Sequence, residues 1–348
     1  MIREWADRTH RDRLLFGCGR APSLAMIHRI ALLVDPVGLD TAVAAWTTAR
    51  TRTSDTPLPA IAIDGKEVRG SKHANGDRVF LMAALDQADG TVLAQEAIGV
   101  KTNEIPHLPL LLDRLGSLDG KVVTIDALHT LGVQAKAIIA RGGHYVFTVK
   151  ANQHALRERR ASQGWSRRTP GYQAREKAHG RTSTREAAVQ PAQAWIGFPH
   201  AAQTMRIIRG RNEHGTENKT GELAYVITSL PPKLAGATEL AELIRGHWGI
   251  ENRLHWVRDT AYREDASQVR TGHAAHVMAS LRALDHEPET VRQLTGLRNR
   301  PANRGTPPVR GATTARTATH RMEPKRASRT FPYGCDSAPL GPIPRRGK

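Results

Sequence analysis

The chain has 348 residues, and its 51 lysines and arginines against 33 acidic residues give a formal net charge of +18. A basic excess of this size, spread over the whole chain, predicts a polyanionic partner, of which nucleic acid is the commonest. Two cysteines exclude a disulfide framework and a four-thiolate zinc site. Because no apolar run approaches about 18 residues and no leader pattern opens the chain, we expect a cytoplasmic protein that makes no membrane contact.

The N-terminal part of the sequence has a helical pattern. In residues 1–50 apolar side chains recur at helical spacing, with a break at Pro22 and Ser23. Residues 51–59, TRTSDTPLP, are polar and contain two prolines, which is typical of a linker. We therefore expect a partial helical domain at 1–50, joined by the 51–59 linker to a domain that begins near residue 60.

From residue 60 the periodicity changes from helical to strand-like. A hairpin is indicated by Asp89-Gly90 between two strand patterns, and short apolar runs indicate buried strands further on. Since hairpins give antiparallel neighbours and helical crossovers give parallel ones, the order predicts an α/β fold with a mixed sheet. The predicted strands are 60–64, 78–85, 91–100, 121–125 and 145–149, and the predicted helices are 109–115 and 133–140.

Two later segments differ in composition from this core. Residues 154–222 are rich in Arg, Gln, Ser and Gly, and we interpret them as an insertion into the core domain, which runs from 60 to 284. A helical pattern returns at about 237 and continues to about 284. The last segment, 285–348, holds 13 of the 51 basic residues and 9 of the 20 prolines, with almost no apolar periodicity. Such a composition predicts a disordered basic tail.

Two aspartates stand at the ends of apolar strand patterns. Asp64 follows Ala60-Ile-Ala-Ile, and Asp126 follows Val122-Val-Thr-Ile. If these strands are neighbours, both carboxylates lie close together at the sheet rim, where like charges are costly unless a cation lies between them. Oxygen ligands of this kind favour Mg²⁺ or Mn²⁺ over zinc. The competing interpretation is that each aspartate caps a turn or a helix, which is the commoner role of an aspartate at a strand end.

A third acidic residue, Glu251, lies in the segment IRGHWGIENRLHWVR, residues 244–258. On a helix it shares a face with His247, His255 and Arg258. An acid among basic side chains suits a metal ligand beside a phosphate path, but an ordinary amphipathic helix explains the same spacing. The pair Glu264-Asp265 is a nearby rival. Two histidines eight residues apart, without a third soft ligand, are weak evidence for zinc.

Basic and amide side chains follow the last predicted core strand. Residues 150–153, KANQ, suit phosphate contacts at the sheet rim, although a solvated loop has the same composition. The stretch 157–168 combines arginines with Trp165, which suits backbone binding with base stacking. A solvated loop explains this stretch nearly as well.

Six motifs in a fixed order resemble one known family. They are IDGKEVRGS at 63–71, KTNEI at 101–105, VTIDA at 123–127, YVFTVKANQ at 145–153, HGR at 179–181, and residues 244–265 with their HWGIEN and LHW elements. Their order and spacing, over about residues 60–282, are similar to those of DDE-type insertion-sequence transposases of the H-repeat-associated subgroup.

This resemblance implies an RNase H-like core in which Asp64, Asp126 and Glu251 are the catalytic acids. It further implies Mg²⁺ or Mn²⁺ held by these three residues, and metal-dependent cleavage of transposon ends with strand transfer into target DNA. The expected partner is double-stranded DNA, both inverted-repeat ends and target, bound by a homodimer in the nucleoid. The residues that we expect to contact DNA are Lys66, Lys150, Asn152, Gln153, His247 and Arg258.

The ends of the chain depart from the family pattern. Compared with the family pattern, we expect the beginning of the helical domain to be absent, and after about residue 284 an Arg/Pro/Thr/Gly-rich stretch stands where the family has an apolar helical ending. We therefore expect a transposase truncated at its N-terminus and altered in frame at its C-terminus. The alternatives are an inactive remnant that acts as a DNA-binding protein and a structure-specific RNase H-like nuclease.

Overall fold

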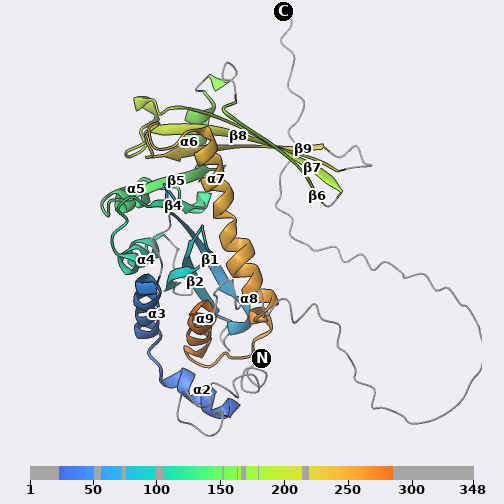
Figure 1. Cartoon of the computed structure of the whole chain (residues 1–348). Helices are drawn as coiled ribbons and strands as arrows, with labels where there is room; N and C mark the ends of the chain where they lie inside the picture. The colour runs from blue at the N-terminus through green and yellow to red at the C-terminus, as the bar shows by residue number, and fades with distance from the viewer. Residues whose placement is uncertain are drawn as a thin grey trace, which may run out of the picture. The chain divides into compact units, whose positions relative to one another are not determined.

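The computed structural model describes residues 23–284, except for 51–55, 73–75, 99–104, 151–152, 163, 166–169, 179 and 214–218. All described residues belong to one compact unit (Figure 1). Its helices are α2 (Leu24–Leu33), α3 (Pro36–Arg50), α4 (His107–Leu115), α5 (Gly132–Ile139), α6 (His154–Ala161), α7 (Ala237–His247), α8 (Trp256–Thr260) and α9 (Ala274–Leu284). Its strands are β1 (Ala60–Val68), β2 (Val79–Asp86), β3 (Val92–Ile98), β4 (Val122–Ile125), β5 (His144–Val149), β6 (Tyr172–Ala178), β7 (Arg181–Pro191), β8 (Gln203–Glu213) and β9 (Lys219–Thr228).

The nine strands form one mixed sheet in the order β3-β2-β1-β4-β5-β9-β8-β7-β6. β1, β4 and β5 are parallel, while β1, β2 and β3 are joined by antiparallel pairing. The predicted hairpin lies between β2 and β3, with Gly90 in its turn at a φ of +86°. The mixed sheet predicted from the sequence is therefore confirmed.

Alternation along the central strands divides the core into two layers. Ile61, Ile63 and Val123 pack with the apolar residues of α4 and α5 on one face of the sheet. Ala60 and Val122 face the other way and pack against α7, which lies across this face in Figure 1. Side chains alternate along a strand. Asp64 in β1 and Asp126 just after β4 therefore point to the same face as Ala60 and Val122, which is the face that α7 covers.

The described N-terminal helices pack onto this core. α3 contacts β3 and α9, and its buried Asp40 accepts hydrogen bonds of 2.6 Å from both His276 Nε2 and Ser280 Oγ of α9. Ser23 caps α2, where its hydroxyl accepts a hydrogen bond from the Met26 amide. The break predicted at Pro22 and Ser23 thus coincides with the start of a helix, and α3 is bonded to the last described helix.

The 154–222 segment contains more strand than its sequence pattern indicated. β6, β7 and β8 are consecutive antiparallel neighbours, and β9 joins them to β5, so that they extend the core sheet. Charged and small residues alternate on β6 and β7, and the buried positions of β7 are Ala187 and Ala188 together with the polar Thr182 and Gln190. Alanine carries little apolar surface, which explains why the hydrophobic alternation of these strands is weak in the sequence.

The C-terminal helical pattern is also interrupted. After α7 the chain continues as a π-helix, η7 (Ile250–His255), and then as α8, before the 3₁₀ turn η8 (Glu264–Ala266) breaks it. η8 packs against the turn η2 (Arg69–Ser71) that follows β1. A Cβ atom at Gly70 would lie 2.4 Å from the Glu264 carbonyl oxygen and 2.8 Å from that of Ser267. Glycine at position 70 is what allows these two backbones to meet.

We expect Gly70→Ala to lower the free energy of unfolding by about 1–3 kcal/mol, because backbone atoms must move to admit the methyl group. Guanidinium denaturation measures this change. Gly221→Ala on β9 is the matched control, since a Cβ there meets nothing within 4 Å. Equal stability of the two variants would contradict the close approach of η8 to Gly70.

Among the described residues no single helix is long and apolar enough to cross a membrane, although α2 and α3 pass that test together as a pair bent by 89°. Several predicted segments fall outside the described residues: most of the 51–59 linker, the first 22 residues, the KTNE of the 101–105 motif and the 285–348 tail. The domain boundaries near 50 and 284 stay predictions.

Candidate active site

Asp64 and Asp126 lie at neighbouring positions of the sheet. β1 and β4 run parallel with Ile63 opposite Ile125, and each aspartate follows its paired isoleucine. Both occupy positions whose alternation directs them to the α7 face. The predicted pairing of the two strands is confirmed. The predicted end of the first strand at residue 64 is wrong, because β1 continues to Val68 in antiparallel pairing with β2 and Asp64 therefore lies within it.

Glu251 approaches this face from the π-helix η7. One ligand atom from each of Asp64, Glu251 and His255 can be chosen so that all three lie within 4.8 Å of one another. Burial raises the pKa of Glu251, His255 opposes this rise, and the neighbouring Asp64 carboxylate adds to it. A π-turn inside a helix frequently accompanies a functional position. Here it presents Glu251 and His255 to Asp64, in the middle of β1.

His255 orients the first aspartate. Its Nε2 lies 3.2 Å from Asp64 Oδ2 and its side chain is 6% exposed. Burial raises the pKa of Asp64, but the hydrogen bond and charge of His255 outweigh this effect and bring the pKa below its usual value. Among the described residues the buried His255 Nδ1 has no hydrogen-bond partner.

His247 lies within electrostatic range of both aspartates. Burial lowers its pKa, while the charges of Asp64 and Asp126 partly oppose that shift. Its Nδ1 lies 3.1 Å from the Thr124 hydroxyl, which also accepts a 2.7 Å hydrogen bond from Gln87 Nε2. The imidazole is thus held by a buried threonine of β4 rather than lying free on the surface.

Asp126 is more open than Asp64. Its side chain is 45% exposed, and its Oδ1 accepts a 3.0 Å hydrogen bond from Lys150, which is itself 53% exposed. Asp126 is not a member of the 4.8 Å cluster. Gln153 begins the turn before α6 and is half-buried, whereas Asn152 lies outside the described residues. The exposed ammonium of Lys150 is therefore available at the sheet rim.

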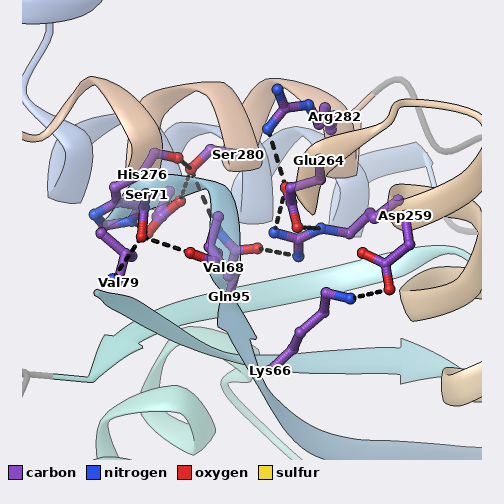
Figure 2. A network of polar contacts seen from close by, with 12 residues as sticks. Lys66, Val68, Ser71, Val79, Gln95, Asp259, Glu264, His276, Ser280 and Arg282 are labelled. Atoms are coloured by element: carbon purple, nitrogen blue, oxygen red, sulfur yellow. Dashed lines mark hydrogen bonds and ion pairs between the residues drawn. The ribbon is translucent and has the colours of Figure 1, made fainter. Parts of the chain in front are cut away.

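Two residues expected to contact DNA lie in other surroundings. Arg258 is fully buried, and its guanidinium donates two 2.9 Å hydrogen bonds to Glu264 and a third, of 3.3 Å, to Gln95. This position corrects the expectation that Arg258 binds a phosphate, because a buried bidentate ion pair leaves it no solvent-facing donor. Lys66 is only 12% exposed and pairs with Asp259 at 2.5 Å (Figure 2).

The rival acidic pair has a structural role. The buried Glu264 also accepts a 3.0 Å hydrogen bond from Arg282 of α9 (Figure 2), and Asp265 lies 3.8 Å from Arg69. Trp165, interpreted as a base-stacking residue, is 3% exposed and packs beside Tyr225 with Arg206 over its ring. It is a core residue in this structure.

His255 and Thr124 are site residues to which the sequence reasoning gave no role. Both had a recognisable signal. His255 follows Glu251 by four residues and so shares its helical face. Thr124 precedes Asp126 by two residues and so shares its strand face. Neither spacing identifies the partner of the residue, because His255 contacts Asp64 of β1 and Thr124 contacts His247 of α7, each on a different element.

The donor set suits a divalent cation. Half-buried Asp64 and exposed Glu251 bring two carboxylates together, and Asp64 disfavours the ionised form of Glu251. A cation between them removes this repulsion. Carboxylate oxygens are the ligands that Mg²⁺ and Mn²⁺ prefer. The cluster therefore fits a divalent metal ion.

Comparison with known proteins agrees with the motifs. The family described as "Transposase DDE domain" matches residues 55–284. The chain is 31% identical over 239 residues to "Putative transposase YncI" of Escherichia coli O157:H7, covering 64% of this chain and 60% of that protein. It is 29% identical over 244 residues to "H repeat-associated putative transposase YhhI" of Escherichia coli K12, covering 64% and 61%.

A cryo-EM structure of a piggyBac transposase synaptic complex with hairpin DNA is a weak structural neighbour. It has a TM-score of 0.33 and 11% identity, and the match covers 72% of this chain and 56% of that one. The chain spans about 60% of the length of the curated relatives named above. The family match covers all three acids and the elements that carry them. The chain therefore belongs to the family of transposase DDE domains.

Proposed function

We propose that this chain is a DNA transposase that cleaves transposon ends and joins them to target DNA with the help of divalent metal ions. The observation that carries this proposal is the convergence of Asp64 and Glu251 within one 4.8 Å cluster, next to the strand end that bears Asp126. The strand order β3-β2-β1-β4-β5, with an antiparallel β1-β2-β3 hairpin series, supports an RNase H-like core for this reaction.

Each acid has a defined part in the proposed site. Asp64, Asp126 and Glu251 would hold Mg²⁺ or Mn²⁺, which supplies charge stabilisation on phosphate oxygens and an activated nucleophile when bound. His255 fixes the orientation of Asp64 through their 3.2 Å contact. Thr124 fixes His247 between the two strand ends. These contacts hold the ligands in place before DNA arrives, which reduces the reorganisation that catalysis requires.

The proposed reaction consists of two displacements at phosphorus. In the first, a water oxygen attacks the phosphodiester at the transposon end, the bond between phosphorus and the 3′ oxygen breaks, and a 3′-hydroxyl and a 5′-phosphate result. In the second, that 3′-hydroxyl attacks a phosphodiester of target DNA and displaces its 3′ oxygen. Lys150, whose ammonium lies beside Asp126, is placed to neutralise a phosphate next to the reacting bond.

The proposed partner is double-stranded DNA in the nucleoid, both inverted-repeat ends and target, bound by a homodimer. The basic composition supports DNA binding of this kind, since phosphate neutralisation supplies most of the affinity for DNA. Lys150, Gln153 and His247 remain the proposed contacts to the DNA backbone, and His247 lies within electrostatic range of Lys150. Asn152 stays a prediction.

Supercoiled plasmid tests this function directly. The full chain is expected to produce nicked circles with Mg²⁺ or Mn²⁺, and none after EDTA addition. Asp64→Asn should remove the nicking, while Asp113→Asn, at an exposed aspartate of α4 paired with Arg141, should not. Salt-dependent DNA binding without nicking in either metal would overturn the catalytic proposal and favour a DNA-binding protein instead.

A further inference from the structure

A groove of about 800 Å³ lies between α7 and the strands β6–β9 of the inserted segment. Trp248 and Asn252, which are close to Glu251 in the sequence, line this groove, whereas Asp64, Asp126 and Glu251 do not. Its charge is strongly one-sided, because five arginines and only two glutamates line it. The arginines are Arg181, Arg185, Arg209, Arg245 and Arg253, and the glutamates are Glu222 and Glu242.

Strand alternation gathers these guanidinium groups on one side of the sheet. Arg181 and Arg185 are four residues apart on β7 and therefore share a face. On β8, Arg209 lines the groove, while Arg206 points to the opposite face and lies over the Trp165 ring. The side of the sheet that faces α7 is thus positively charged along β7 and β8, and Arg245 of α7 and Arg253 of η7 add two further guanidinium groups.

The ion pairs that these arginines form are partly open to solvent. Arg209 lies 3.3 Å from Glu222, whose side chain is 60% exposed. Arg185 and Arg245 both pair with Glu176, at 3.3 and 2.5 Å, with 32% and 55% of their side chains exposed. Pairs of this kind contribute little to stability, and a guanidinium has five N–H donors, so donors remain for an anionic ligand.

An exposed aromatic residue stands where the groove meets the candidate active site. Trp248 lines the groove and is 55% exposed. It precedes Glu251 by three residues, so that its side chain lies within one helical turn of the carboxylate. Asn252, the neighbour of Glu251, lines the same groove. A ligand strand that runs from Asp64 and Glu251 along this helix would enter the groove at the Trp248 ring.

Guanidinium groups and an aromatic face together recognise a nucleic-acid strand. Guanidinium forks match the geometry of phosphates, and bases stack on exposed aromatic rings in strands that lack a pairing partner. An acidic peptide would engage the arginines but has no need of the indole. Resting on the function proposed above, we propose that this groove binds an unpaired DNA strand continuing from the phosphodiester at Asp64 and Glu251.

Tryptophan fluorescence tests the position of the bases. With a twelve-residue oligo(dT) in EDTA, the full chain is expected to lose part of its emission on binding. Trp248→Phe should abolish most of this quenching. Trp256→Phe is the matched control, since Trp256 is 56% exposed but does not line the groove. Quenching that persists in Trp248→Phe, or that disappears in Trp256→Phe, would overturn the proposal.

Salt dependence tests the arginines. The double variant Arg181→Gln with Arg209→Gln is expected to weaken oligo(dT) binding by about tenfold or more at low salt. It should also reduce the slope of log K against log salt by about 0.7 for each phosphate that the variant no longer neutralises. Arg175→Gln on β6 is the control, because Arg175 is exposed and lies outside the groove. Unchanged affinity and slope, or an equal change in Arg175→Gln, would overturn the proposal.

These binding measurements separate the groove from the catalytic proposal, because EDTA removes any metal-dependent cleavage. If the protein binds oligo(dT) through Trp248 and the arginines but never nicks plasmid, the catalytic proposal is wrong and the groove proposal is supported. If the protein nicks plasmid while both groove tests fail, the catalytic proposal is supported and the groove proposal is wrong. Circular dichroism of each variant confirms that it is folded.

Discussion

The Asp126→Ala variant is expected to lose about 1,000-fold in metal-dependent nicking, while its affinity for DNA stays within about twofold of wild type. A metal ligand contributes several kcal/mol of charge stabilisation in the transition state, and each 1.36 kcal/mol is a factor of about ten in rate. DNA affinity depends instead on many basic contacts spread over the chain. Initial rates of plasmid nicking and fluorescence anisotropy of a labelled duplex measure the two quantities.

The structure makes this variant informative because Asp126 is not part of the 4.8 Å cluster. Asp113→Ala, at a 62% exposed aspartate, controls for the loss of one surface carboxylate. Nicking by Asp126→Ala at the wild-type rate would contradict the assignment of Asp126. If His255→Ala then lost nicking, the ligand set would consist of Asp64, Glu251 and His255.

The second large effect concerns stability. Glu264→Ala is expected to lower the free energy of unfolding by about 3–5 kcal/mol, because it leaves buried guanidinium groups unpaired. Glu264 and Arg258 are fully buried, and Arg282 is 7% exposed. Figure 2 shows Glu264 and Arg282 packed together above the strands. Guanidinium denaturation of the two proteins at neutral pH measures the change.

A surface pair provides the control for this prediction. Glu222→Ala removes a 60% exposed partner of Arg209 and should change stability by about 1 kcal/mol or less. Acid provides a second check. Burial raises the pKa of Glu264, but Arg258 and Arg282 outweigh this and bring the pKa below its usual value. The carboxylate therefore stabilises the fold above the pKa of the unfolded chain, and this contribution is lost as the pH falls through the lower folded pKa.

The stability difference between wild type and Glu264→Gln should accordingly be largest near neutral pH and should shrink on acidification. Urea denaturation over a pH series measures this trend. A difference that stays constant down to the lowest pH at which the protein folds would show that the ion pairs with Arg258 and Arg282 do not stabilise the protein. The same ion pairs anchor the helical stretch that carries Glu251, seven residues before Arg258.

The core strands were largely predictable from the sequence, although β1 continues four residues beyond Asp64. Apolar runs that end at Asp64 and Asp126 located β1 and β4, and the alternation of hairpin and crossover signals predicted their mixed sheet. Helical spacing placed Glu251 on one face with His247 and His255. The motifs that resemble the transposase family lie on these elements, and the family match covers them.

The environment of each basic side chain was not predictable. Arg258 and Lys150 are both basic in the sequence, yet Arg258 is fully buried on Glu264 and Lys150 is 53% exposed at the rim. The break between α8 and α9 decides this difference, because it turns η8 back toward β1. No local sequence pattern predicts the turn at η8. The strands β6 and β7 were equally hard to recognise, since the buried positions of β7 are small or polar residues. The apolar stretches 205–208 and 224–228, by contrast, indicated strands at the places of β8 and β9.

Local sequence was sufficient to predict the core elements, because strand and helix periods depend on side chains that are close neighbours along the chain. It was also sufficient to place Asp126 directly after a buried strand and to show how large the excess of positive charge is. Long-range packing alone determines which charges pair, which arginines line the groove beside α7, and that His255 rather than Asp126 lies in the cluster with Asp64 and Glu251. Such contacts join residues far apart in the chain: His255 and Asp64 are 191 positions apart and Ser280 and Asp40 are 240 apart. No pattern among chain neighbours specifies a contact over such a separation.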